Sequence, residues 1–314
     1  MPRATVNGML AITVETENGQ RHTRATAGQL AGLVRRIGGE GDRFLVVQRI
    51  PDLPDVFVQV WHDAGGAYTL EYREGGPDRH FGTTLEGPAP VIAAMTGWAR
   101  ASEDWNAGLD WERLDLELPA PVPPLELDDE DRGLLEARVR EVIVGGCATR
   151  EELAELAEDY LVTAGSRPVS PEQARELTDR MWLERVAEQA AWTEEETDPE
   201  RISRAFAVLE AAGLTAREHF TCCRSCGQSE IGGAGAPGAR GFVYFHSQST
   251  EAAAAGHGLT LHYGGFDGSP DTTTSVGREV VAALERCGLS VEWDGDPGQA
   301  ITVTPLDWRK RLVG

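Results

Sequence analysis

The sequence predicts an α+β protein, with an N-terminal antiparallel sheet and covering helices, then acidic helices followed by a small α/β layer. Three observations predict this class. Residues 1–116 contain five short stretches of β-branched and aromatic residues but only two amphipathic helices. A proline-rich segment then interrupts all periodicity. Beyond it, charged helical segments give way to alternating strands and helices.

The N-terminal strands are expected to form an antiparallel meander. The expected strands lie at 9–14, 44–48, 56–61, 68–72 and 80–84. In the third of these, Val56, Val58 and Val60 alternate with Phe57, Gln59 and Trp61, so both faces are largely apolar and the strand is expected to be central. Helices are expected at 27–37 and 88–100, on the spacing of their apolar residues. These two helices would cover the sheet.

The segment 119–124, PAPVPP, predicts a stiff extended linker. We therefore expect three parts: an α+β domain at 1–118, a linker at 119–126, and an acidic helical segment with a cysteine-containing α/β domain at 127–314.

Four acidic helices are expected after the linker. The first spans 129–144, and the others begin at capping residues Thr149, Ser170 and Asp198. Residues 126–200 hold 22 acidic residues and eight arginines, a net charge of −14. A solvated outer face on amphipathic helices accounts for this charge. The alternative interpretation is a docking surface for a basic partner protein.

The remaining residues are expected to form the α/β layer. Strands are predicted at 242–246, 259–263, 289–293 and 301–304, and helices at 250–255 and 276–287. Residues 294–298 would turn a hairpin between the last two strands. The glycine-rich stretch at 233–238 matches the letters of the G-x-G-x-x-G motif. That motif needs a helix after it to bind phosphate, whereas a strand is predicted here, so we expect a loop.

Composition excludes several functional classes. The chain has 314 residues and a formal charge of −22, from 51 acidic and 29 basic residues, which argues against binding to nucleic acid or to an anionic membrane. Lys310 is the single lysine, so a phosphate loop with its lysine is excluded. The sequence contains no run of about 18 apolar residues, so we expect no membrane-spanning helix. An odd number of cysteines, five, and no apolar N-terminal stretch of signal-peptide length lead us to expect a cytoplasmic protein.

The cluster most suited to chemistry contains three thiols within five positions, Cys222, Cys223 and Cys226. The C-x-x-C spacing of Cys223 and Cys226 lets one tight turn direct two thiolates at a metal ion such as Zn²⁺, and Gly227 follows the turn. A tetrahedral site needs a fourth ligand. Of the nearby histidines, His219, His246, His257 and His262, we expect His246 to supply it, because it lies at the end of a predicted strand of the same domain.

Three other interpretations of this cluster stay open. The first is a redox dithiol, although a helix was expected before the motif where such sites have a strand. The second is a nucleophilic thiol, Cys222 or Cys226, with His246 as base and Glu251 or Glu230 orienting the imidazole. The third is a purely structural role for semi-buried cysteines.

These residues also resemble an uncharacterised actinobacterial family with a C-terminal domain of unknown function. The resemblance covers about residues 127–314 and rests on the segments CCRSCG at 222–227, FH at 245–246, TE at 250–251 and WDG at 293–295. Residues 1–116 resemble a second family of unknown function, and their layout is similar to that of small α+β immunity proteins. Neither resemblance implies an activity.

We therefore expect a binding or interaction protein with an immunity-like or regulatory role and a cysteine-rich, zinc-stabilised C-terminal domain. The alternative is a thiol-dependent enzyme, either a Cys–His hydrolase or a redox dithiol, that uses the same three cysteines.

Overall fold

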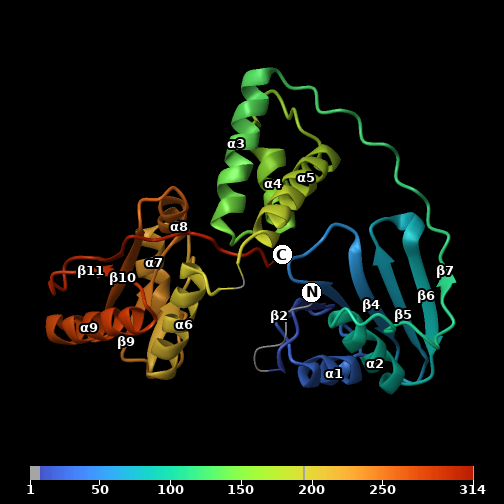
Figure 1. The fold of residues 1–314 in the computed structure, drawn as a ribbon, viewed down its shortest axis with the longest axis horizontal. Coiled ribbons are helices and arrows are strands. Elements are labelled where there is room, and N and C mark those ends of the chain that lie inside the picture. Colours follow the sequence, from blue (N-terminus) through green and yellow to red (C-terminus); the bar gives the residue numbers. More distant parts are fainter. Residues whose placement is uncertain (1–7, 194, 314) are drawn as a thin grey trace. The chain divides into compact units, whose positions relative to one another are not determined.

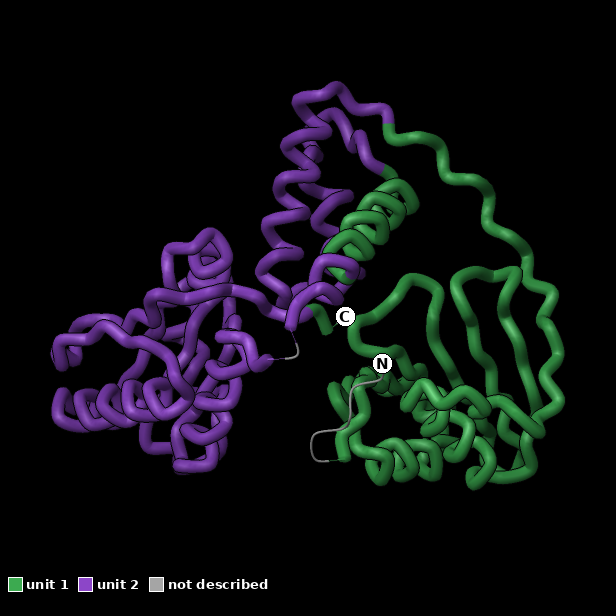
Figure 2. The backbone as a smooth tube through the Cα atoms, viewed as in Figure 1, with its two compact units in different colours: residues 1–125, 170–186, 312–314 green, residues 126–169, 187–311 purple. Residues whose placement is uncertain are grey.

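The computed structural model describes residues 8–193 and 195–313. It confirms the α+β class, with an N-terminal antiparallel sheet of seven strands, several helices and then a small mixed sheet (Figure 1). Two compact units are distinguished in Figure 2. The first comprises residues 1–125, 170–186 and 312–314, and the second comprises residues 126–169 and 187–311. The expected domain boundaries at 118 and 127 stay a prediction.

The sheet of the first unit has the strand order β2-β1-β3-β4-β5-β6-β7, with every neighbouring pair antiparallel. The strands are β1 (Ile12–Thr16), β2 (Arg21–Thr23), β3 (Phe44–Arg49), β4 (Val56–His62), β5 (Tyr68–Glu74), β6 (His80–Leu85) and β7 (Glu112–Arg113). The strand β4 is central, as its two apolar faces predicted. The edge strands β2 and β7 were not predicted, because they contain three and two polar residues, which give no apolar alternation.

Helices α1 (Ala27–Arg36) and α2 (Pro88–Ala99) pack on one face of this sheet. Thr26 begins α1 with a capping box, since its side chain accepts from the Gln29 N–H while the Gln29 side chain accepts from the Thr26 N–H. The helices bury apolar side chains against Val58, Val60 and Leu70. Because side chains alternate along a strand, the other face presents Gln59, Trp61, Thr69 and Glu71.

The acidic segment is helical, as predicted. It comprises α3 (Asp129–Gly145), α4 (Arg150–Asp159), α5 (Pro171–Ala190) and α6 (Asp198–Ala211). Capping boxes at Thr149 and Thr197 begin α4 and α6. The expected cap of α6 was Asp198, which is instead its first helical residue, because the capping box joins Thr197 to Glu200. Helix α3 ends at Gly146, whose positive φ of 71° suits a left-handed C-terminal cap. Each of these helices buries apolar residues along one side, so most of the charge stays at the surface.

The sheet of the second unit has the order β11-β12-β10-β9-β8, with β8 parallel to β9 and the other pairs antiparallel. The strands are β8 (Leu214–Arg217), β9 (Gly241–Tyr244), β10 (Leu259–Gly265), β11 (Val291–Glu292) and β12 (Ile301–Val303). The helices are α7 (Arg224–Glu230), α8 (Ser247–Ala254) and α9 (Pro270–Arg286). Strand β8 and helix α7 were not predicted, and α8 begins three residues before the expected position 250.

Side-chain alternation along β9 separates two packing environments. Val243 and Phe245 lie in the main core of this unit with apolar residues of α6 and α9. Phe242 and Tyr244 point to the opposite side, where they form a smaller core with Ile231 and the half-buried Phe220. The cysteine cluster lies on this second side, next to Tyr244.

Candidate metal centre

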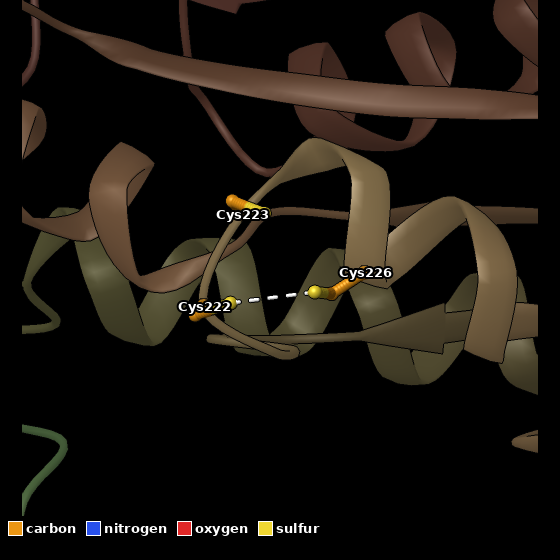
Figure 3. A group of neighbouring side chains, drawn as sticks. All are labelled: Cys222, Cys223 and Cys226. Atoms are coloured by element: carbon orange, nitrogen blue, oxygen red, sulfur yellow. Dashed lines mark hydrogen bonds between the residues drawn. The ribbon is translucent and has the colours of Figure 1, made fainter.

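The three cysteines converge at the start of helix α7 (Figure 3). Their sulfur atoms all lie within 4.8 Å of one another, and the Sγ atoms of Cys222 and Cys226 are 3.5 Å apart. All three thiols are free, and Cys222 is exposed while Cys223 and Cys226 are half-buried. Four thiolates around a zinc ion have sulfur–sulfur distances of about 3.8 Å, given Zn–S bonds of about 2.3 Å. The cluster can therefore hold a metal ion with little movement.

Hydrogen bonds hold the loop before α7 against the β9–α8 junction. The Phe220 N–H donates to the Phe245 carbonyl at 2.8 Å, and the Ser247 N–H donates to the Thr221 carbonyl at 3.1 Å. The Ser247 hydroxyl donates to the carbonyl of Cys222 at 3.0 Å. Thr221 has a positive φ of 60°, an uncommon conformation for a β-branched residue that the surrounding contacts maintain. The cluster is thus fixed to the sheet before any metal binds.

Helix α7 approaches the sheet closely at one glycine. A Cβ atom on Gly227 would lie 2.7 Å from Tyr244 Cζ, nearer than van der Waals contact allows. The Tyr244 hydroxyl donates to the carbonyl of Arg224 at 3.1 Å and ties the helix to β9. Gly227, which follows the turn of the two cysteines, therefore lets α7 pack closely against β9.

The thiols differ in acidity. Hydrogen bonds from the Cys226 N–H, and then from the thiols of Cys222 and Cys226, lower the pKa of Cys223. The neighbouring thiols of Cys222 and Cys223 raise the pKa of Cys226 to about 11, because a second thiolate beside the first is unfavourable. In the metal-free protein, Cys223 therefore ionises before Cys226. A bound cation would favour all three thiolates.

His246 lies beside the cysteine loop, but its Nδ1 accepts a hydrogen bond from the Ser249 N–H at 3.2 Å. It is the N-cap of α8, the helix that was expected to begin at residue 250. Its ring stacks on that of His262 in β10, with centroids 5.2 Å apart. The mutually close metal-ligating atoms found in the described part of the chain are the three sulfurs, without His246. The role of His246 as fourth ligand stays a prediction.

Glu251 forms an ion pair with Arg138. Its Oε1 accepts from Arg138 of α3 at 3.1 Å, and this ion pair joins α3 to α8. Glu230 is the last residue of α7 and is exposed. Arg138 therefore occupies the carboxylate that was expected to orient His246, and the catalytic roles of Glu251, His246, Cys222 and Cys226 stay predictions.

His262, one of the candidate histidine ligands, is paired with Tyr244, a residue that the sequence did not single out and that packs against α7. Their rings lie 5.3 Å apart, because the two residues are paired across β9 and β10. Burial, then the charges of His246 and Arg224, lower the pKa of His262 to about 4. Its Nε2 is buried without a hydrogen-bond partner in the described structure. The pairing of Tyr244 with His262 could have been predicted from the sequence only if the ends of β9 and β10, and hence their register, had been known.

The element before the cysteine motif is a strand and not the expected helix. Strand β8 lies between α6 and the cysteines, and α7 begins at Arg224 with Cys223 as its N-cap. The motif therefore has the strand–loop–helix context that dithiol sites use. The four residues of β8 are too few to show an alternation in sequence.

Comparison with known families agrees with the sequence resemblance. Residues 128–312 match a family described as a domain of unknown function (DUF6891), which is more than half of the chain. The chain belongs to the DUF6891 family. The match includes the acidic helices and the cysteine cluster. No curated protein and no solved structure matches the chain. No helix in the described ranges is both long and apolar enough to cross a bilayer.

Proposed function

We propose that the DUF6891 domain of this protein is a zinc-binding module of a cytoplasmic interaction protein. The observation that carries the proposal is the convergence of three thiols within 4.8 Å at the start of α7. Thiolate ligands favour Zn²⁺ among the common divalent ions, and a closed tetrahedral site would be structural. The five free cysteines favour a reducing compartment.

In this proposal Cys222, Cys223 and Cys226 supply three ligands and His246 supplies the fourth. His246 would have to leave the Ser249 N–H or present its Nε2, and its position next to the cysteine loop supports either route. The bound ion would join α7, the loop before it and the start of α8 into one unit. Interaction with a partner would then depend on metal.

The test is the metal content of the reduced protein, measured by native mass spectrometry after incubation with one equivalent of Zn²⁺. We expect one zinc per chain, and loss of that zinc in Cys226→Ser. Ser225→Ala is the matched control, because Ser225 is exposed in the same turn and has no thiol. A protein without zinc, or a Cys226→Ser variant that binds as the parent does, would refute the site.

A second candidate, a redox dithiol, is favoured by the 3.5 Å separation of the Cys222 and Cys226 sulfurs and by the strand–loop–helix context. Oxidation by a low-molecular-weight disulfide such as oxidised glutathione would form one intramolecular disulfide. Two thiols would lose two protons and two electrons, and the glutathione disulfide would be reduced to two thiols.

Thiol labelling separates the two candidates. In the metal-free reduced protein, iodoacetamide at neutral pH should label Cys223 before Cys226, since the pKa of Cys223 is lowered while that of Cys226 is about 11. If zinc is the function, one equivalent of Zn²⁺ should suppress the labelling of all three cysteines. If Zn²⁺ leaves the labelling unchanged and oxidised glutathione gives a two-dalton mass loss, the dithiol is the better assignment.

A further inference from the structure

The sheet of the first unit has a cavity on the face opposite α1 and α2. Its volume is about 380 Å³, and it is lined by Phe44 of β3, by Gln59, Val60 and Trp61 of β4, and by Thr69 and Glu71 of β5. This volume lies in the range of small-molecule pockets, about 300–1,000 Å³. The wall combines aromatic rings with one carboxylate. None of these residues belongs to the DUF6891 match at 128–312.

The aromatic part of the wall is preformed. The rings of Phe44 and Trp61 are stacked, with centroids 5.9 Å apart and planes 9° from parallel, because the two residues face each other across β3 and β4. The Trp61 side chain is nevertheless 39% exposed. An accessible indole beside a cavity offers a large, rigid contact surface to a planar or apolar ligand.

Hydrogen bonds fix the carboxylate of Glu71 in place. Its Oε2 accepts from Gln59 Nε2 at 2.7 Å, and it lies 3.1 Å from Nε2 of the buried His80. Arg73 Nε donates to Nδ1 of His80 at 3.0 Å. A guanidinium has no acceptor, so Nδ1 carries no hydrogen and Nε2 donates to Glu71. Glu71 therefore faces two donors, which suit its ionised form.

The charge of this carboxylate is not balanced by the neighbouring arginines. Arg73 pairs with Asp55 at 2.8 Å, and Arg43, which lies 4.8 Å from the centroid of the Trp61 ring, pairs with Glu17 at 2.8 Å. The tautomer that accepts from Arg73 leaves His80 neutral. Oε1 of Glu71 has no hydrogen-bond partner among the described residues. The cavity thus has one net negative charge and one free acceptor on its wall.

From this geometry we infer that the cavity binds a small organic cation, with an amidinium, guanidinium or ammonium group on Glu71 and an apolar body on Phe44 and Trp61. The carboxylate supplies a charge-assisted hydrogen bond, and the rings supply apolar contact to the body of the ligand. The hydroxyl of Thr69 and the amide of Gln59 supply further polar contacts at the wall. This inference does not depend on the metal centre.

Benzamidine is a suitable probe, because it combines a flat ring with an amidinium, and benzamide is its neutral counterpart. Calorimetric titration of the full chain should give one site for benzamidine. Benzamide should bind roughly tenfold to a hundredfold more weakly, as expected for loss of a charge-assisted hydrogen bond. Glu71→Gln should weaken benzamidine binding by a similar factor. The glutamine oxygen can still accept from His80, so the sheet should stay folded.

The matched control is Glu74→Gln, an exposed carboxylate near the end of the same strand, which should leave the affinity unchanged. Trp61→Leu should weaken benzamidine and benzamide alike, and it tests the aromatic wall if Glu71→Gln fails to fold. Equal affinity for the charged and neutral probes, or full binding by folded Glu71→Gln, would overturn the inference. So would an arginine-containing peptide that binds far more tightly than any free cation, because the natural ligand would then be a protein.

Discussion

At the scale of single residues, burial lowers the pKa of His262, which lies beside Tyr244 in the second sheet. The imidazole is enclosed by Tyr244 and His246, and its pKa is lowered to about 4. Burial also lowers the pKa of His246. Both groups are therefore neutral in the folded protein at pH values where free histidine already takes up a proton. This difference links protonation to folding.

We predict that stability falls as the pH decreases from about 6.5 to 4, and that His262→Phe reduces this loss. Between these values the unfolded chain binds a proton that folded His262 does not, so acid favours unfolding. Above pH 6.5 the contribution is constant, and below pH 4 both states are protonated. The slope from one histidine cannot exceed about 1.4 kcal/mol per pH unit, and partial solvent access to the ring makes it smaller.

The measurement is urea denaturation of the metal-free, reduced protein at several pH values. His257→Phe is the matched control, since His257 is exposed in the turn before β10. A control variant that flattens the profile as much as His262→Phe does would show that the buried ring is not responsible.

At the scale of elements, the sequence predicted most strands and helices because each carries its own signal. Helices α1, α4 and α6 have capping residues and apolar stripes, and β4 alternates along its whole length. The element that holds the candidate site was missed. Helix α7, RSCGQSE, has a glycine and two serines, which are weak helix formers. It is only seven residues long, so its helicity depends on packing against Tyr244.

The convergence of the three cysteines was predicted by spacing alone, since two intervening residues bring thiols to one turn. The surroundings were not. Which side chains face α7 depends on the register of β9 with β10, where Tyr244 is paired with His262. The hydrogen-bond partner of Glu251 is Arg138, which lies 113 positions earlier in the chain. Contacts of this kind depend on tertiary packing and leave no local pattern.

The close approach of α7 to β9 yields a prediction about Gly227. In Gly227→Ala the new methyl would collide with the Tyr244 ring, which is itself held between Phe220 and His262. We expect a loss of about 1–3 kcal/mol in the free energy of unfolding, as for other overpacked sites. The affinity for Zn²⁺ should also fall, because α7 carries Cys226.

Gly232→Ala is the matched control, because a Cβ there would have no neighbour within 4 Å. Chemical denaturation and zinc titration of both variants give the comparison. If Gly227→Ala is as stable as Gly232→Ala and binds zinc equally well, the contact with Tyr244 is not what positions the cysteines.

At the scale of the whole molecule, the charge is unevenly distributed. The chain carries −22, and residues 126–200 account for −14 of it. Several of these carboxylates are already paired with arginines, such as Glu158 with Arg167 and Glu196 with Arg204. Exposed ion pairs of this kind contribute little to stability. Others, including Glu151 and Glu155 of α4, are exposed on the helix surface. These exposed carboxylates are the groups that a basic partner would contact.

We predict that the acidic helices bind a basic protein, through electrostatic attraction that steers association. Neutralising exposed carboxylates should then weaken binding mainly through the association rate, and salt should do the same because it screens charges beyond about 8–10 Å. The variant is the double substitution Glu151→Gln with Glu155→Gln. Neither residue is the capping Glu152, so α4 should keep its start.

The experiment is affinity capture from a bacterial lysate at low salt, followed by identification and measurement with the purified partner. Support requires a captured protein with a high isoelectric point, an association rate that falls as salt rises, and a further loss in the α4 double variant. Glu86→Gln with Glu103→Gln is the matched control, since it removes two exposed charges from the first unit. An equal loss in both double variants would mean that net charge alone attracts the partner, and a salt-independent complex would exclude the acidic helices as the docking surface. Only a difference between the variants assigns the partner to α4, because the two proteins carry the same total charge.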